Sequence, residues 1–119
     1  MNHLNIAKQA LIAQARAVNE LADRLNGEFQ SAVELLLSCQ GRAVVCGMGK
    51  SGLIGQKMVA TFASTGTPSF FLHPAEAFHG DLGMLKPVDV VILISYSGET
   101  EEVIKLIPSL KSFGNKIIA

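Results

Sequence analysis

The sequence has no excess of charge of either sign. Lysine and arginine together number 10, aspartate and glutamate also number 10, and the formal net charge is zero. Proteins that bind nucleic acid or anionic membranes through electrostatics carry a basic excess, because neutralised phosphates supply most of that affinity. The balance therefore excludes nucleic acid as the leading partner, and we expect none.

Long apolar runs are also absent. The longest unbroken aliphatic run, Val90 to Ile94, is far shorter than the ~20 residues that cross a bilayer. A secretory signal has a continuous apolar stretch, whereas the first residues of this chain interleave apolar with polar side chains, namely Lys8, Gln9, Gln14 and Arg16. We therefore expect no transmembrane helix, no membrane partner and a cytoplasmic protein.

Cysteine is scarce, and the two that occur show no functional spacing. Cys39 and Cys46 form neither a CxxC motif nor a metal-ligand pattern. We expect both to be inert, buried thiols.

The composition that remains is that of a packed domain. The chain has 119 residues, which fits one domain or part of one. It is 49% hydrophobic and 17% charged, richer in apolar residues than a disordered segment. A chain of this size buries about two thirds of its unfolded surface, so we expect a hydrophobic core.

The first part of the chain has helical periodicity. Apolar residues recur at helical spacing from Leu4 to Leu25, with members seven positions apart at Leu4, Leu11, Val18 and Leu25. Asn26-Gly27 predicts a left-handed stop, followed by a second helix from Phe29 to Gly41. We interpret residues 1–41 as a helical hairpin and 42–119 as a separate domain. The long apolar stripe either caps the core or forms an oligomerisation surface, and the pattern leaves both open.

From residue 42 the pattern alternates between strands and helices. Strands are predicted at 43–46, 69–73, 89–95 and 116–119, with helices after the first loop and over 99–113, the latter kinked at Pro108. Residues 74–85 are expected to hold only a helical turn. The alternation predicts an α/β fold with a doubly wound, flavodoxin-like parallel sheet, in which the apolar strand 89–95 is central. Because the chain stops inside its fourth strand, we expect the front part of a longer domain.

In such a sheet, ligands bind beyond the carboxyl ends of the strands. The first loop there, Gly47 to Gly52, matches G-x-G-x-x-G, yet the second strand does not end in the acidic residue that a dinucleotide site needs. A P-loop would require glycine at position 44, which is valine. What remains is a loop of small residues at a helix start, whose backbone N–H groups and partial positive charge attract phosphate.

The loop after the third strand repeats this feature. Ser95, Ser97 and Thr100 surround a glycine at the start of the last helix, a composition suited to several hydrogen bonds with a dianion. A plain helix cap would explain Ser97 or Thr100 but not Ser95 and Ser51 as well. A single phosphate on a small polar molecule is the ligand that the two loops predict.

The loop after the second strand carries ionisable side chains. His79-Gly80-Asp81 offers an imidazole and a carboxylate for proton transfer, whereas a metal site there would lack a well-spaced third ligand. His73, at a strand end, is interpreted as structural. Three acids also begin the last helix, at Glu99, Glu101 and Glu102, and composition does not choose among them. No metal or other cofactor is expected.

Three segments together, 44–52, 63–84 and 95–100, resemble the sugar isomerase (SIS) superfamily and, within it, the bacterial arabinose 5-phosphate isomerases. The resemblance implies interconversion of ribulose 5-phosphate and arabinose 5-phosphate through an enediol, without metal, in a homotetramer that serves Kdo and lipopolysaccharide synthesis. It implies three catalytic residues, with Glu102 as the base, His79 as the ring-opening or relay group and Lys50 as the electrostatic stabiliser. The implied substrate-binding residues are Gly49, Ser51, Ser95, Ser97, Gly98 and Thr100.

The resemblance also limits what this chain can do. The family carries a further glutamate, a further histidine and usually a pair of CBS modules, which these 119 residues lack. We therefore expect the chain alone to be inactive. Two alternatives stay open, a sugar-phosphate-binding regulatory module without turnover and an isomerase of another phosphosugar, although the ionisable residues at 50, 79 and 102 favour an enzyme.

Overall fold

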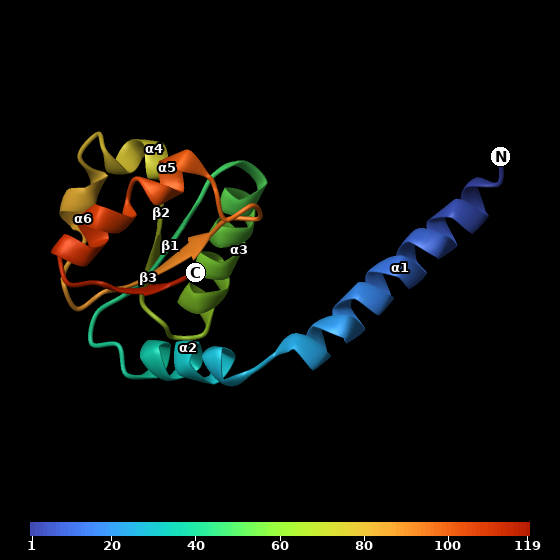
Figure 1. Ribbon diagram of the computed structural model, residues 1–119, viewed down its shortest axis with the longest axis horizontal. Helices are drawn as coiled ribbons and strands as arrows, with labels where there is room; N and C mark the ends of the chain where they lie inside the picture. The colour runs from blue at the N-terminus through green and yellow to red at the C-terminus, as the bar shows by residue number, and fades with distance from the viewer. The chain divides into compact units, whose positions relative to one another are not determined.

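The computed structural model describes residues 1–119 and divides them into two compact units, Met1–Val33 and Glu34–Ala119 (Figure 1). The domain boundary predicted between residues 41 and 42 stays a prediction.

Both predicted N-terminal helices are present. Helix α1 spans His3–Arg24, and Asn2 caps it, its side-chain oxygen accepting a 3.0 Å hydrogen bond from the Asn5 N–H. Helix α2 spans Gly27–Leu37. The left-handed stop predicted at Asn26-Gly27 is wrong, because Leu25 is extended and Gly27 has no positive φ. Asn26 instead starts α2, since its side chain accepts a 2.9 Å hydrogen bond from the Glu28 N–H.

The second helix also ends before Gly41, where the sequence predicted its end. It stops at Leu37, and the Ser38 hydroxyl donates back to the Glu34 carbonyl at 2.8 Å. Beyond this point Gly41 packs against the Asp89 side chain, and the Arg42 N–H donates to Asp89 Oδ1 at 2.8 Å. The chain therefore leaves the helix early so that it can join the sheet.

The second unit is built on a parallel sheet with the strand order β2-β1-β3-β4. The strands are β1 (Ala43–Gly47), β2 (Ser69–Leu72), β3 (Val90–Ile94) and β4 (Lys116–Ile118). All four predicted strands are confirmed, and β3 is an inner strand whose first four residues are buried. Strand β1 pairs with β2 on one side and β3 on the other, in a register that aligns Gly47 with Ile94.

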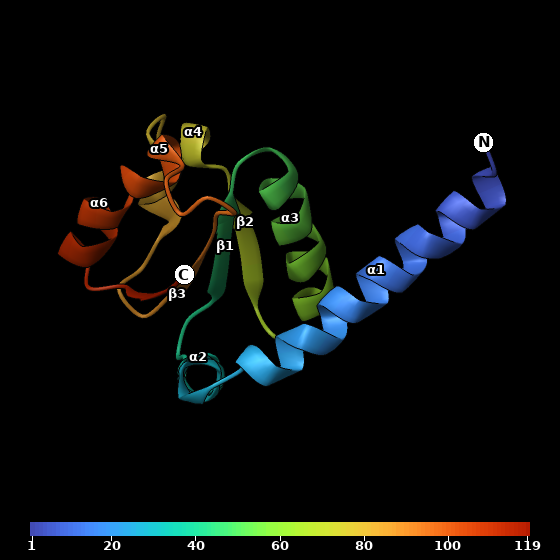
Figure 2. The ribbon, with the colours of Figure 1, turned by 45° about the vertical axis from the view of Figure 1, so that its right-hand side comes forward.

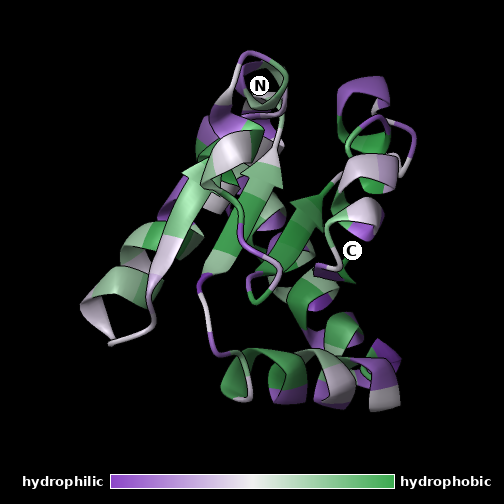
Figure 3. Ribbon diagram, turned by 90° about the vertical axis from the view of Figure 1, so that its left-hand side faces the viewer, coloured by the Kyte–Doolittle hydropathy of each residue, from purple (hydrophilic) through white to green (hydrophobic).

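Helices cover both faces of the sheet, which confirms the doubly wound arrangement. Helix α3 (Gly49–Ser64) packs on one face, and α4 (Pro74–Ala77), α5 (Glu101–Ile104) and α6 (Ile107–Ser112) lie on the other (Figure 2). Hydrophobic residues are concentrated in the strands between these layers (Figure 3). The main buried cluster consists of Val44, Cys46, Leu72, Ala77, Val91, Leu93, Val103, Leu106 and Leu110.

Two segments contain more and shorter helices than predicted. Residues 74–85 hold α4 and also a 3-10 helix, η1 (Asp81–Met84), where one helical turn was expected. The helix predicted over 99–113 is divided into α5 and α6, with Pro108 in the first turn of α6. Proline has no N–H to donate to the preceding turn, so it is tolerated at a helix start but not inside a helix. The expected kink is therefore a complete break.

None of the helices combines the length and the hydropathy that crossing a membrane requires.

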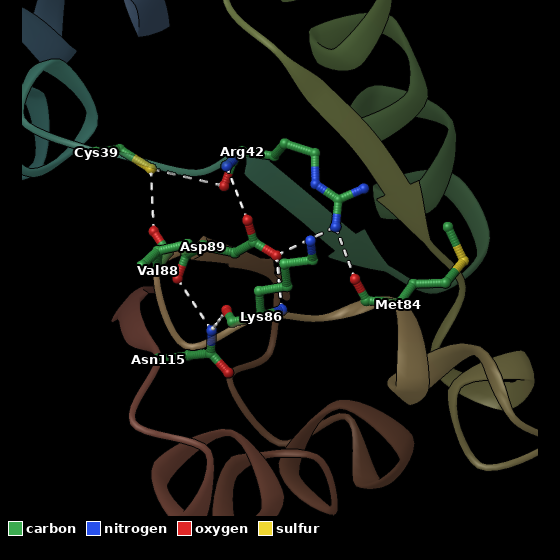
Figure 4. A network of polar contacts seen from close by, with 7 residues as sticks. All are labelled: Cys39, Arg42, Met84, Lys86, Val88, Asp89 and Asn115. Carbon is green, nitrogen blue, oxygen red and sulfur yellow. Dashed lines mark hydrogen bonds and ion pairs between the residues drawn. The ribbon is translucent and has the colours of Figure 1, made fainter.

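A buried carboxylate makes the central contacts at the end of the sheet where the strands begin (Figure 4). Asp89 is only 2% exposed, and its side chain accepts hydrogen bonds from the backbone N–H groups of Arg42 and Lys86, each at 2.8 Å. The Arg42 guanidinium lies 3.3 Å from Asp89 Oδ2 and also donates to the Met84 carbonyl at 2.6 Å. These contacts tie the segment before β1 to the segment before β3.

Asn115 extends this network to the segment before β4. Its side-chain amide donates to the Lys86 carbonyl at 2.8 Å and to the Asp89 carbonyl at 3.0 Å. A single connected set of hydrogen bonds therefore fixes the starts of β1, β3 and β4.

We expect Asp89→Ala to lower the free energy of unfolding by about 1–3 kcal/mol, because it leaves the part-buried N–H groups of Arg42 and Lys86 without their acceptor. Urea denaturation measures this change, and the exposed Asp81→Ala serves as the control. Burial raises the pKa of the Asp89 carboxyl, but the hydrogen bonds from Lys86 and Arg42 and the Arg42 charge outweigh it and hold the pKa below its ordinary value.

A carboxyl with a lowered pKa stabilises the fold at pH values above its unfolded pKa of about 3.9, and that contribution is lost as pH falls through the folded value. The difference in the free energy of unfolding between wild type and Asp89→Ala should therefore decrease as the pH is lowered into the acid range. A difference that stays constant down to the acid transition would contradict the lowered pKa of Asp89.

Candidate active site

The parallel register brings two loops together at the carboxyl end of the sheet. Gly47 and Ile94 are the last residues of β1 and β3, and they are register partners. The loop that follows β1 therefore starts beside the loop that follows β3. In this strand order the gap between β1 and β3 is the topological switch point, where ligands bind in α/β sheets.

Glycines let α3 approach the end of β1 closely. A Cβ added to Gly52 would lie 2.7 Å from the Gly47 carbonyl oxygen, and a Cβ added to Gly47 would lie 3.1 Å from the Ser51 carbonyl carbon. One turn further along α3, a Cβ on Gly55 would lie 3.0 Å from the Val45 side chain. These contacts involve backbone or buried side chains that cannot move aside. The glycine-rich motif is therefore required for packing as well as for any ligand.

The first turn of α3 presents Lys50 and Ser51. Gly49 begins the helix with φ of 55°, a conformation that favours glycine. Met48, the N-cap residue, is extended and makes no side-chain cap. The N-terminus of this 16-residue helix therefore has no side-chain cap, and its first turn carries the positively charged residue Lys50, a combination that attracts an anion.

In the loop after β3, Ser95 is the central hydroxyl. Its Oγ lies 2.8 Å from the Thr100 hydroxyl and accepts a 3.0 Å hydrogen bond from the Gly98 N–H. The Ser97 hydroxyl accepts a 3.0 Å bond from the Glu99 N–H. Gly98 has φ of 71°, which closes the loop on itself. The hydroxyls predicted to face a phosphate are thus held in place by the loop's own hydrogen bonds.

This loop differs from the expectation in one respect. The helix that follows it, α5, has only four residues, and Thr100 at its N-cap makes no side-chain cap bond. A helix this short adds little dipole, so the loop contributes hydroxyls and backbone N–H groups rather than a second helix terminus.

A cavity of about 610 Å³ opens at this point, and we call it the switch-point cavity. Its lining residues come from the first turns of α3, the end of β3 and the loop beyond, and they are Lys50, Ser51, Ile54, Ile94, Ser95 and Tyr96. The structure therefore brings together Ser51 and Ser95, one from each predicted phosphate-binding loop. A smaller cavity of about 150 Å³ is also lined by Ser95, together with residues that include Gly98 and Thr100.

The other two predicted catalytic residues, His79 and Glu102, lie elsewhere. His79 lies between α4 and η1 with its side chain 74% exposed, 4.0 Å from the Glu76 carboxylate. Glu102 is exposed on α5, and its neighbour Glu101 pairs with Lys105 at 3.1 Å. Neither His79 nor Glu102 lines the switch-point cavity or the smaller one. Their roles stay predictions.

His73 and the cysteines have structural surroundings. His73 Nδ1 accepts a 3.2 Å hydrogen bond from the Ala75 N–H at the start of α4, in agreement with a structural role. Burial raises the pKa of the Cys46 thiol to about 12, which keeps it protonated and unreactive. Cys39 is only half-buried, contrary to the prediction, because it sits at the surface turn where its Sγ contacts the Val88 carbonyl at 3.4 Å. No three His, Cys, Asp or Glu side chains are placed to hold a metal ion.

Sequence reasoning missed the apolar residues that line the switch-point cavity, namely Ile54, Ile94 and Tyr96. Ile54 and Ile94 have the periodicity of core residues, so nothing in their spacing marks them as site residues. Tyr96 gave a signal, since an aromatic residue between two serines of a predicted binding loop has no core to join.

The fold and the cavity define a doubly wound α/β domain with a ligand cavity at its switch point. The SIS domain family model matches residues 36–119, which is most of the chain. The chain therefore belongs to the SIS domain family.

Individual relatives agree with this assignment. The chain is 67% identical over 119 residues to a Haemophilus influenzae protein named "Probable arabinose 5-phosphate isomerase", covering 100% of this chain and 35% of the relative. It is 58% identical over 104 residues to arabinose 5-phosphate isomerase KdsD of Escherichia coli K12, covering 87% of this chain and 32% of that protein. The chain thus spans about a third of the length of these curated relatives.

A solved structure supports the same fold. An Escherichia coli CFT073 protein in complex with arabinose 5-phosphate superposes with a TM-score of 0.89 at 50% identity, covering 98% of this chain and 64% of that chain.

We expect Gly52→Ala to lower the free energy of unfolding by about 1–3 kcal/mol, because the added Cβ would overlap the Gly47 carbonyl oxygen and push α3 from β1. Thermal and urea denaturation measure the loss. Gly83→Ala is the matched control, since its Cβ would meet nothing within 4 Å. Equal stability of the two variants would contradict the close contact between α3 and β1.

Proposed function

We propose that the protein interconverts ribulose 5-phosphate and arabinose 5-phosphate. One observation carries this proposal, namely that Lys50, Ser51 and Ser95 from two separate loops line a single cavity at the switch point of the sheet. The size of the cavity, about 610 Å³, falls in the range of small-molecule sites.

The polar residues that line the cavity suit a phosphate group. Lys50 supplies positive charge, the first turn of α3 supplies N–H groups, and Ser51 and Ser95 supply hydroxyls. Gly49, Ser97, Gly98 and Thr100 complete the proposed binding set by shaping the two loops. Ligand binding would exchange the internal bonds of Ser95 and Ser97 for bonds to phosphate oxygens.

The proposed chemistry moves a proton between the carbonyl carbon and the hydroxyl-bearing carbon next to it. A base removes a proton from the hydroxyl-bearing carbon, and the carbonyl oxygen gains negative charge and is protonated as the enediol forms. A proton then returns to the former carbonyl carbon, while the hydroxyl on its neighbour loses its proton and becomes the new carbonyl. Glu102 is proposed as the base, His79 as the group that opens the ring or relays protons, and Lys50 as the cation that stabilises the developing charge.

The substrate class is supported by the relatives. Proteins 58–67% identical to this chain are named arabinose 5-phosphate isomerases, and a structural relative at 50% identity holds arabinose 5-phosphate. The further proposals, that the enzyme acts in the cytoplasm, that it serves Kdo and lipopolysaccharide synthesis and that it forms a homo-oligomer, rest on the family resemblance.

A second candidate is a module that binds a sugar phosphate without turnover. The observation that favours it is the position of His79 and Glu102, neither of which lines the switch-point cavity. A regulatory domain needs the phosphate-binding loops but not these ionisable groups. The two candidates therefore differ in turnover and agree in binding.

We expect the full-length protein to equilibrate the two pentose phosphates. Glu102→Gln should reduce the turnover rate by at least about 10²-fold, because a general base contributes about 10² to 10⁴ in rate. The affinity of the variant for the ligand should stay within a few-fold of the wild-type value. NMR detection of the product and calorimetric titration measure the two quantities. Glu99→Gln, a neighbouring exposed carboxylate, is the control.

Unchanged turnover in Glu102→Gln would remove this residue as the base. Binding of pentose phosphate without any interconversion by the wild-type protein would favour the regulatory module.

The stripe of Leu4, Leu11, Val18 and Leu25 is proposed as an oligomerisation surface. We expect Leu11→Asp to weaken self-association at least tenfold, about 1.4 kcal/mol, because it places a charge in an apolar contact. Sedimentation equilibrium measures association, and Gln9→Asp, outside the stripe, is the control. If Leu11→Asp instead lowers the unfolding free energy with association unchanged, the stripe caps the core.

A further inference from the structure

Tyr96 lies at the edge of the switch-point cavity without any partner. It is fully exposed, its hydroxyl makes no hydrogen bond and its ring contacts no other ring. Its backbone, in contrast, belongs to a well-bonded loop. Ser95 on one side bonds to Thr100 and Gly98, and Ser97 on the other bonds to the Glu99 N–H. The loop thus presents an unused aromatic side chain from a fixed position.

The cavity is lined by two chemically different kinds of residue. Lys50, Ser51 and Ser95 are polar and suit an anion, whereas Ile54, Ile94 and Tyr96 contribute apolar surface. A sugar phosphate has the same two parts, a dianion at one end and a chain of C–H groups bearing hydroxyls at the other. With the dianion on the polar residues, the carbon chain is left to contact the apolar ones. Tyr96 is the apolar lining residue that combines a large apolar face with a hydroxyl, a combination found where one side of a contact is apolar and the other is wet.

From this juxtaposition we infer that Tyr96 is a substrate-contact residue, whose ring covers the carbon chain of the bound sugar phosphate while Lys50, Ser51 and Ser95 hold the phosphate. This inference rests on the proposed function. Tyr96 then recognises the sugar part of the substrate rather than its phosphate. This contact gives a function to the most exposed side chain of the site. The aromatic face, rather than the hydroxyl, supplies most of the contact area.

The sequence provides a direct reporter for the test. Tyr96 is the one tyrosine of the chain, and tryptophan is absent, so tyrosine emission comes from this position alone. Titration of the 119-residue chain with arabinose 5-phosphate should change that emission in a saturable way, with the same Kd as calorimetry. Inorganic phosphate should bind more weakly and change the emission less, because it does not reach the ring.

Variants separate the ring from the rest of the site. We expect Tyr96→Ala to weaken arabinose 5-phosphate binding about tenfold by calorimetry, and Tyr96→Phe to stay within about threefold, because the aromatic face is retained. Binding of inorganic phosphate should be the same in wild type and Tyr96→Ala. Phe29→Ala, an exposed aromatic residue on α2, is the matched control.

The outcomes distinguish this inference from the function on which it rests. Unchanged emission together with unchanged affinity in Tyr96→Ala, while wild type binds the sugar phosphate, would overturn the role of Tyr96 and leave the proposed function standing. Equal weakening of inorganic phosphate binding in Tyr96→Ala would show a structural role in the loop and also overturn it. Absence of sugar-phosphate binding by wild type and variants alike would overturn both.

Discussion

The contact between Gly47 and Gly52 is the constraint on which the site depends. The carbonyl oxygen at the end of β1 lies where a side chain at position 52 would begin, so α3 starts directly against the strand. Gly55 continues the same close approach one turn later, against Val45. Because these are contacts of backbone and buried side chains, the direction of α3 is fixed by sterics. The positions of Lys50 and Ser51 are therefore fixed as well, because both residues lie in the first turn of α3.

The second half of the site follows from strand pairing. Strand β3 runs parallel to β1 with Ile94 beside Gly47, and the hydroxyl loop therefore begins where the glycine loop begins. At the opposite end of the sheet, the network around Asp89 ties the residues that precede β1, β3 and β4. The two ends have different tasks. Polar contacts at the amino-terminal end of the sheet tie the strand starts together, and the loops at the carboxyl end carry the polar groups that line the cavity.

Much of this was predictable from the sequence, and the failures have physical reasons. The four strands, the inner position of β3 and the meeting of Ser51 with Ser95 follow from apolar runs and glycine-rich turns, which are local signals. The end of α2 depends on a tertiary contact, the docking of Gly41 on Asp89, that no periodicity records. At Pro108 the local signal was present in the sequence, and only the extent of the effect, a break instead of a kink, was missed. The apolar lining residues Ile54 and Ile94 were missed because their spacing along the sequence is the same as that of core residues. The placement of His79 and Glu102 relative to the cavity depends on how short segments fold over the strand ends, which spacing alone does not determine.

The strand order has a consequence for how the chain folds during synthesis. Strand β1 has two neighbours, and β2 leaves the ribosome well before β3. Until residues 90–94 emerge, a nascent chain has β1 paired along one edge only, and an open edge on an apolar strand is a template for pairing with other chains. Parallel sheets form slowly because their partners are distant in sequence, which prolongs this interval. The arrival of β3 completes the floor of the cavity and covers the open edge of β1, and β4 then covers the outer edge of β3.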